Sequence, residues 1–167
     1  MASGRSNKIV GQTGEYLVAA ELGRRGLIAT TFTGNVPHYD IIASDEHGRH
    51  VSVQVKTVRG SIWQFADIGH YCDIRFRGNT QIVGRAKKCP VRDLVVVFVK
   101  LDDDGADRFY ILPWVKLRDR LVRRHKQYLQ KHNGVRPQRW DSKHTAISEK
   151  DLAPYQDKWE TIAANIR

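Results

Sequence analysis

Residues 51–57, Val-Ser-Val-Gln-Val-Lys-Thr, alternate strictly between apolar and polar side chains. Because successive side chains of a β-strand point to opposite faces, the three valines share one face, and Ser52, Gln54 and Lys56 share the other. A strand with this pattern buries one face in a core and normally turns its polar face to bulk water. The segments that precede it decide whether a solvated polar face is a sufficient interpretation.

Two acidic residues upstream indicate more than a solvated face. Asp40 opens the apolar segment 39–43, Tyr-Asp-Ile-Ile-Ala, which is the pattern of a second strand. Glu15 lies in a helical pattern, and steps of 100° per residue place it on the apolar face with Val18 and Leu22. An unpaired carboxylate on a buried face is costly. Glu15 is therefore either held by an ion pair or backbone cap, or it has a functional role.

The remaining elements follow from hydrophobic periodicity and turn residues. We expect, in chain order, a helix over residues 9–25, strands over 27–32, 39–44 and 51–58, a buried strand over 94–101, an edge strand over 109–112, a basic amphipathic helix over 115–131 and the start of a last helix at 148–151. The turn at 45–48 makes the second and third strands an antiparallel hairpin, and another turn is expected at 33–37. Residues 59–92 give no clear pattern beyond possible short strands at 62–65 and 71–74.

The chain is long enough for one well-formed core and shows no internal repeat. We therefore expect a single domain over residues 1–167. Its core spans about 9–114, and a basic helical extension spans about 115–167.

The sequence also predicts a cytoplasmic protein with no membrane partner. Residues 1–7 lack the apolar stretch of a secretory signal, and the longest apolar run, 94–99, is far shorter than the roughly 20 residues of a membrane helix. Cys72 and Cys89 make no disulfide framework. With His70 they could indicate zinc, but no second pair of ligands is present.

The charge balance indicates a polyanionic partner. The chain has 28 Lys and Arg against 18 Asp and Glu, a net charge of +10, and each phosphate that a protein neutralises releases condensed counterions. A merely solvated basic surface is the alternative. We expect the helix over 115–131 and the loop after it to contact DNA phosphates through Arg118, Arg123, Arg124, Lys126, Arg136 and Arg139. No helix-turn-helix or zinc-finger pattern predicts base-specific reading.

Phosphodiester chemistry would explain the polar face of the 51–57 strand. Gln54 and Lys56 share that face with Cα atoms ~7 Å apart, and an antiparallel hairpin brings Asp40 to the same patch. Glu15 reaches it if the first helix packs over that face. Hydrolysis of a phosphodiester needs a divalent cation and an ammonium group, and hard Mg²⁺ prefers oxygen ligands. Asp40 offers an anionic oxygen and Gln54 a neutral amide oxygen.

These motifs, Gly-Glu at 14–15, Tyr-Asp-Ile-Ile at 39–42 and Val-Gln-Val-Lys at 53–56, resemble the PD-(D/E)XK nuclease superfamily, in particular its Holliday junction resolvase-like branch, in which a first-helix Glu joins the site. The resemblance covers about residues 9–58, with a weaker match at 94–99. It implies an α/β, restriction endonuclease-like α-β-β-β-α-β core with a mixed central sheet and additional C-terminal helices.

The resemblance also implies an activity, that of a DNA endonuclease dependent on Mg²⁺ (or Mn²⁺). Asp40 and Gln54 would hold the metal, with the carbonyl of Val55 as a further ligand. Glu15 would bind it through water or hold a second ion, and Lys56 would position the attacking water. Because superfamily members often pair two sites across a dimer, we also expect a homodimer.

One residue departs from the family pattern. Gln54 stands where the family usually has Glu, which removes a negative charge from the metal site. Some members, including certain homing endonucleases, carry Gln there and still cleave. The alternative function is a catalytically inactive nucleic-acid-binding module on the same fold. Trp63 and Phe65 could stack on bases, but filling the core explains them more simply.

Overall fold

The computed structural model describes residues 4–32, 34 and 36–167, which form two compact units. The first unit comprises Met1–Trp63, Cys89–Trp114 and Ser148–Arg167, and the second comprises Gln64–Lys88 and Val115–Ile147. The expectation of a single domain stays a prediction. The turn expected at 33–37 includes residues 33 and 35, which lie outside the described part of the chain.

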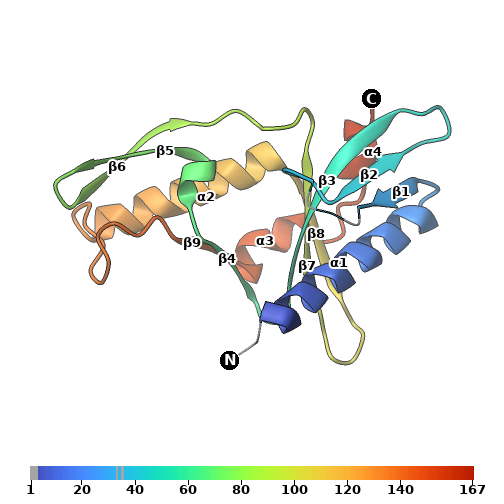
Figure 1. The fold of residues 1–167 in the computed structure, drawn as a ribbon, viewed down its shortest axis with the longest axis horizontal. Coiled ribbons are helices and arrows are strands. Elements are labelled where there is room, and N and C mark those ends of the chain that lie inside the picture. The colour runs from blue at the N-terminus through green and yellow to red at the C-terminus, as the bar shows by residue number, and fades with distance from the viewer. Residues whose placement is uncertain (1–3, 33, 35) are drawn as a thin grey trace. The chain divides into compact units, whose positions relative to one another are not determined.

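A five-stranded mixed sheet is the centre of the first unit (Figure 1). Its strands, in spatial order, are β1 (Ile28–Thr31), β2 (Ile41–Ser44), β3 (His50–Val58), β7 (Val95–Lys100) and β8 (Arg108–Pro113). The β1–β2, β2–β3 and β7–β8 pairs are antiparallel, whereas β3 and β7 run parallel. The predicted mixed α/β fold class and the antiparallel hairpin of β2 and β3 are confirmed.

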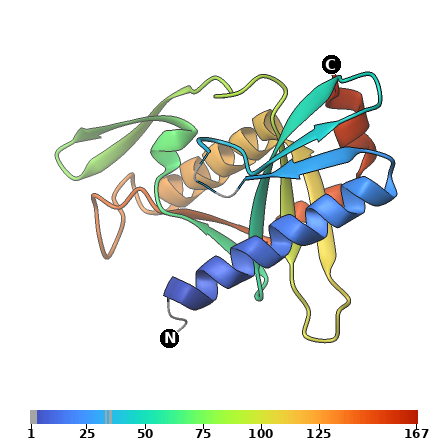
Figure 2. The same ribbon diagram turned by 45° about the vertical axis from the view of Figure 1, so that its right-hand side comes forward.

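Helix α1 (Gly4–Arg24) packs along this sheet (Figure 2). Its Val18 and Leu22 are fully buried in one cluster with the valines of β3 and β7, which supplies the hydrophobic stabilisation of the unit. Gly14 allows the close approach, because a Cβ at this position would overlap the Oγ1 of Thr57 on β3. Gly26, with φ of +79°, follows the end of the helix, where glycine readily adopts this left-handed conformation.

The opposite face of the sheet is closed by aromatic residues. The Trp63 ring meets Phe98 at 5.3 Å and Tyr110 at 6.0 Å between ring centroids, both edge to face. Its Nε1 donates a hydrogen bond to the carbonyl of Lys56 at 2.9 Å. Trp63 and Phe65 are both buried, so core filling explains them, as the sequence favoured.

The second unit contains a β-ribbon and a helix. The ribbon consists of β5 (Cys72–Arg77) and β6 (Thr80–Ala86), follows the short η1 (Ile68–His70), and lies along α2 (Trp114–Lys131) in both views (Figures 1 and 2). Buried Gln81 fixes β6. Its side-chain amide donates to the carbonyls of Trp140 at 2.7 Å and Ser142 at 2.8 Å, and its Oε1 lies 3.1 Å from Nε2 of His125.

The remaining elements are short. They are β4 (Ile62–Phe65), β9 (Thr145–Ser148), α3 (Glu149–Leu152), η2 (Ala153–Tyr155) and α4 (Glu160–Asn165). β4 and β9 form a two-stranded sheet. Ser148 and Asp151 make a capping box at the start of α3, where the sequence placed a helix start. Within the described residues, no helix has the length and apolar character needed to cross a bilayer.

Candidate active site

Asp40 lies immediately before β2 and is tied to β3 by two hydrogen bonds. Its backbone N–H donates to the carbonyl of Val53 at 2.8 Å, and its Oδ2 accepts the backbone N–H of Val55 at 2.7 Å. The register pairs Ile41 with Val53, and one further step places Asp40 opposite Gln54. The carboxylate is thus held where the β2–β3 hairpin begins, on the face of Gln54, as the antiparallel hairpin predicted.

Glu15 and Asp40 border one cavity of about 450 Å³ in the first unit. The other residues that line it are Lys8, Gly11 and Gln12 of α1, and Phe32, Gly34, Val36 and Tyr39 of the segment before β2. Phe32 and Tyr39 meet edge to face at 5.7 Å between centroids. The two acids therefore face a space that has an aromatic wall and one added cation, Lys8.

The pKa values of both carboxyl groups are raised, so their charged forms are disfavoured at this place. Burial raises the pKa of Glu15, and the negative charge of Asp40 raises it further. Burial also raises the pKa of Asp40, although the Val55 N–H and the Lys56 ammonium both oppose that rise. A cation placed between these carboxylates would relieve their repulsion.

Lys56 is the third member of this group. Burial lowers the pKa of its ammonium, and the nearby Asp40 carboxylate partly restores it. Asp40 is thus the common neighbour, since it interacts with Glu15 on one side and with Lys56 on the other. Lys56 itself does not line the cavity of Glu15 and Asp40.

Gln54 is half-buried on β3, on the face that it shares with Lys56. Its side-chain amide makes no hydrogen bond to any residue that the structure describes, so its oxygen is available as a ligand. Like Lys56, it is outside the lining of the cavity. The structure therefore links Glu15, Asp40 and Lys56 electrostatically, and strand register places Gln54 opposite Asp40. The expectation that α1 packs over the face of Gln54 and Lys56 is wrong, because its apolar residues pack against the valine face of β3.

The donor set suits a hard divalent cation. Asp40 uses Oδ2 for the Val55 N–H, while its Oδ1 has no hydrogen-bond donor among the described residues. Together with Glu15 and the Gln54 amide this gives oxygen ligands with at most two negative charges, which fits Mg²⁺ that retains several waters. No group of three or more His, Cys, Asp or Glu that could hold a metal occurs within the described residues.

Two cavity residues, Lys8 and Gln12, were missed by the sequence analysis. With Glu15 they follow the spacing of one helix face, but the helix was expected to begin at residue 9, whereas it begins at Gly4. The segment before Ile9 is polar and has little helical pattern. The spacing back from Glu15 would have found both residues.

The residues expected to contact DNA lie on α2 and the loop after it. Arg118 donates to the Lys87 carbonyl at 2.8 Å, and Arg136 donates to the His144 carbonyl at 2.9 Å. Arg139 lies 3.7 Å from the carboxylate of Asp141. The side chains of Arg123, Arg124 and Lys126 are exposed.

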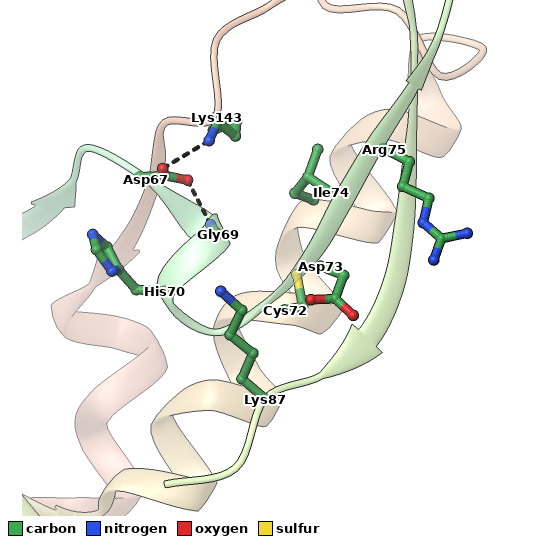
Figure 3. A pocket seen from close by; sticks show the side chains of 9 residues that line it. All are labelled: Asp67, Gly69, His70, Cys72, Asp73, Ile74, Arg75, Lys87 and Lys143. Atoms are coloured by element: carbon green, nitrogen blue, oxygen red, sulfur yellow. Dashed lines mark hydrogen bonds and ion pairs between the residues drawn. The ribbon is translucent and has the colours of Figure 1, made fainter. Parts of the chain in front are cut away.

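A second cavity, of about 560 Å³, lies wholly in the second unit (Figure 3). Its polar lining includes His70, Lys87 and Lys143, but also two aspartates. Asp67 accepts from Lys143 at 2.8 Å and from the backbone N–H of Gly69 at 2.6 Å, as the dashed lines show. Its cations are thus partly neutralised within the pocket.

Solved structures share this architecture. The bacterial homing endonuclease I-Ssp6803I is similar with a TM-score of 0.51 and 15% sequence identity, over 95% of this chain and 94% of that one. Hjc, a Holliday junction resolvase from Archaeoglobus fulgidus, is similar with a TM-score of 0.47 and 15% identity, over 92% and 95%. No protein-family model and no curated protein sequence matches the chain. The chain has a restriction endonuclease-like fold, as the sequence analysis predicted.

Proposed function

We propose that this protein is a metal-dependent DNA endonuclease that hydrolyses phosphodiester bonds at Asp40. The observation that carries the proposal is the position of Asp40, which interacts with the acid of α1 and the lysine of β3 beside a cavity. Carboxylates and an ammonium with shifted pKa values, gathered at one place, are typical of a site built for chemistry. The fold, which a homing endonuclease also uses, supports the same function.

The ligands follow from the oxygen donors. Asp40 and Gln54 would hold Mg²⁺ (or Mn²⁺), the Val55 carbonyl would be a further ligand, and Glu15 would bind through water or hold a second ion. Mg²⁺ bound there would neutralise the phosphate and make a bound water more acidic. The Asp40 carboxylate would meet the metal in a fixed orientation, because its Oδ2 accepts the Val55 N–H.

Lys56 acts as an ammonium donor. Its Nζ orients the attacking water and stabilises the negative charge that develops on the phosphate. Burial lowers the pKa of this ammonium, and the Asp40 carboxylate opposes that fall. A charge in such a partly desolvated place acts more strongly than it does in water.

DNA binding and pairing complete the proposal. The exposed side chains of Arg123, Arg124 and Lys126 on α2 would contact phosphates, together with Arg139, while Arg118 and Arg136 would add charge from positions held within the unit. Two copies would form a homodimer, so that two sites act on two strands.

The alternative, a non-catalytic DNA-binding module on the same fold, is favoured by one residue. Gln54 gives the metal a neutral ligand in place of a carboxylate, which weakens the affinity for a hard cation. We place catalysis first because Glu15, Asp40 and Lys56 are all present.

Cleavage assays separate the two functions. Purified protein is incubated with plasmid and with branched DNA in Mg²⁺, Mn²⁺ or EDTA, and Asp40→Ala is assayed beside the wild type. We expect cleavage in Mg²⁺ or Mn²⁺ alone and none by Asp40→Ala, which should still bind DNA. Undiminished cleavage by Asp40→Ala would exclude this mechanism, and DNA binding without cleavage in any metal would establish the module.

A further inference from the structure

The excess positive charge of the chain belongs entirely to its second unit. By sequence, that unit has 15 Lys and Arg against 4 Asp and Glu, whereas the first unit has 13 against 14. The net charges are +11 and −1. A surface of the second unit on which cations outnumber acids is therefore the best candidate for binding the polyanion.

The β5–β6 ribbon presents such a surface. Register pairs Arg75 with Ile82 and Arg77 with Thr80, so these four side chains share one face. The opposite face carries Gln81, which is buried and hydrogen-bonded within the unit. One face of the ribbon is thus attached to its unit, and the other is open.

An irregularity in the ribbon adds a third arginine to the open face. The register shifts between Cys72 and Ile74, so that β6 has one residue more than β5 there. Gly84 fits this bulge because a Cβ at that position would lie 3.1 Å from the Cβ of Asp73. The result is a shallow hollow of about 460 Å³ lined by Asp73, Arg75, Ile82, Gly84 and Arg85.

The three arginines are not engaged elsewhere. The side chains of Arg75, Arg77 and Arg85 are exposed, and no hydrogen bond or ion pair joins their guanidinium groups to a residue that the structure describes. The cavity of Figure 3 differs, because Lys143 is paired with Asp67 there. Arg75 lines both hollows, and on the ribbon face it lies with Arg77 and Arg85.

We infer that the β5–β6 ribbon enters the major groove of duplex DNA through the face of Arg75, Arg77 and Arg85. The major groove is wide enough for a two-stranded ribbon, and guanidinium groups fit both phosphate oxygens and the acceptors of base edges. Ile82, between them on the same face and exposed, meets the apolar parts of the groove. The inference rests on the proposed function only in taking DNA as the ligand.

Binding measurements on the full chain test this inference. The ribbon variant is Arg75→Ala/Arg77→Ala/Arg85→Ala, and the control, Arg92→Ala/Lys150→Ala/Lys158→Ala, removes the same charge from exposed positions of the first unit. Fluorescence anisotropy with a 30-base-pair duplex in EDTA gives the Kd. We expect the ribbon variant to bind at least about tenfold more weakly and the control to change by less than about threefold, with unfolding curves of both variants equal to wild type.

A second duplex, with 5-glucosyl-hydroxymethylcytosine in place of cytosine, fills the major groove whatever the sequence. Wild type should bind it about tenfold more weakly than the plain duplex, and the ribbon variant should bind both alike. Equal binding of the two duplexes by wild type, or equal Kd for ribbon and control variants, would overturn the inference. Cleavage assays keep the two proposals apart: an inactive wild type with a ribbon-dependent Kd refutes only the nuclease, and an active one with a ribbon-independent Kd refutes only the ribbon.

Discussion

The two units of this chain differ in what their charges do. In the first unit, cations and anions nearly balance, and burial shifts the pKa values of three partly buried charges, Glu15, Asp40 and Lys56. In the second unit, cations exceed anions almost fourfold and most are exposed. Charge that is buried and paired positions chemistry, whereas charge that is exposed and in excess attracts a polyanion. A net charge of +10 for the whole chain conceals this division.

If the charges are divided in this way, removing a charge from the candidate site of the first unit should slow cleavage without weakening DNA binding. Lys56→Ala removes the ammonium beside Asp40, so we expect single-turnover cleavage to slow by about 10²-fold or more. The Kd for the same duplex in EDTA should change by less than about twofold. Lys150→Ala, which removes an exposed lysine of the same unit, is the control. Equal losses of rate and affinity would mean that Lys56 binds DNA.

Removing cations from the second unit should have the opposite effect, weakening DNA binding without slowing cleavage at saturating DNA. Arg123→Ala/Lys126→Ala removes two exposed cations of α2, and we expect the slope of log Kd against log salt to fall by about 2, with affinity reduced about tenfold at moderate salt. Cleavage at saturating DNA should stay the same. An unchanged slope would show that α2 is a solvated face.

The close packing of the first unit gives a smaller effect, in stability. Gly14→Ala would place a methyl group against Oγ1 of Thr57, and we expect the free energy of unfolding to fall by about 1–3 kcal/mol. Gly11→Ala on the same helix meets nothing within 4 Å and should raise it by about 0.5–1 kcal/mol. Urea unfolding measures both. Equal effects of the two changes would contradict the packing of α1 on β3.

The raised pKa of Asp40 predicts the smallest effect, a dependence of stability on pH. Because the pKa of Asp40 is raised in the folded protein, its contribution to stability is fully present below the carboxyl pKa of the unfolded chain, about 3.9, and is lost as pH rises through the folded value. In EDTA, the free energy of unfolding of wild type should therefore fall relative to that of Asp40→Asn as the pH rises above about 4. Asp104→Asn, at an exposed turn, should follow wild type. Parallel curves for wild type and Asp40→Asn would show that Asp40 is not desolvated.

Sequence predicted the first unit better than the second for a physical reason. Strict alternation in β3 and unbroken apolar sequence in β7 are imposed by burial of one or both sheet faces, so they are visible in the sequence. β6 was missed because its buried position is the polar Gln81, which satisfies two carbonyls, and because the bulge at Gly84 breaks the alternation.

In the candidate site, too, the sequence reveals what periodicity imposes and not the contacts that depend on tertiary structure. Glu15, Asp40 and Lys56 were found from helix and strand periodicity. The contact between Asp40 Oδ2 and the Val55 N–H depends on the close of the hairpin, which periodicity does not specify. Likewise the start of a last helix was expected at 148–151, but α3 is four residues long, and nothing in the sequence analysis separated it from α4.

Direct titration of metal tests the central claim, that the first unit holds a divalent cation at Asp40 and Gln54. Calorimetry with Mg²⁺ and Mn²⁺ compares wild type, Asp40→Ala and Gln54→Glu, each without DNA. We predict one saturable binding event in wild type, its loss in Asp40→Ala, and binding at least as tight in Gln54→Glu, because a carboxylate binds a hard cation better than an amide does. Identical isotherms for all three proteins would contradict the account.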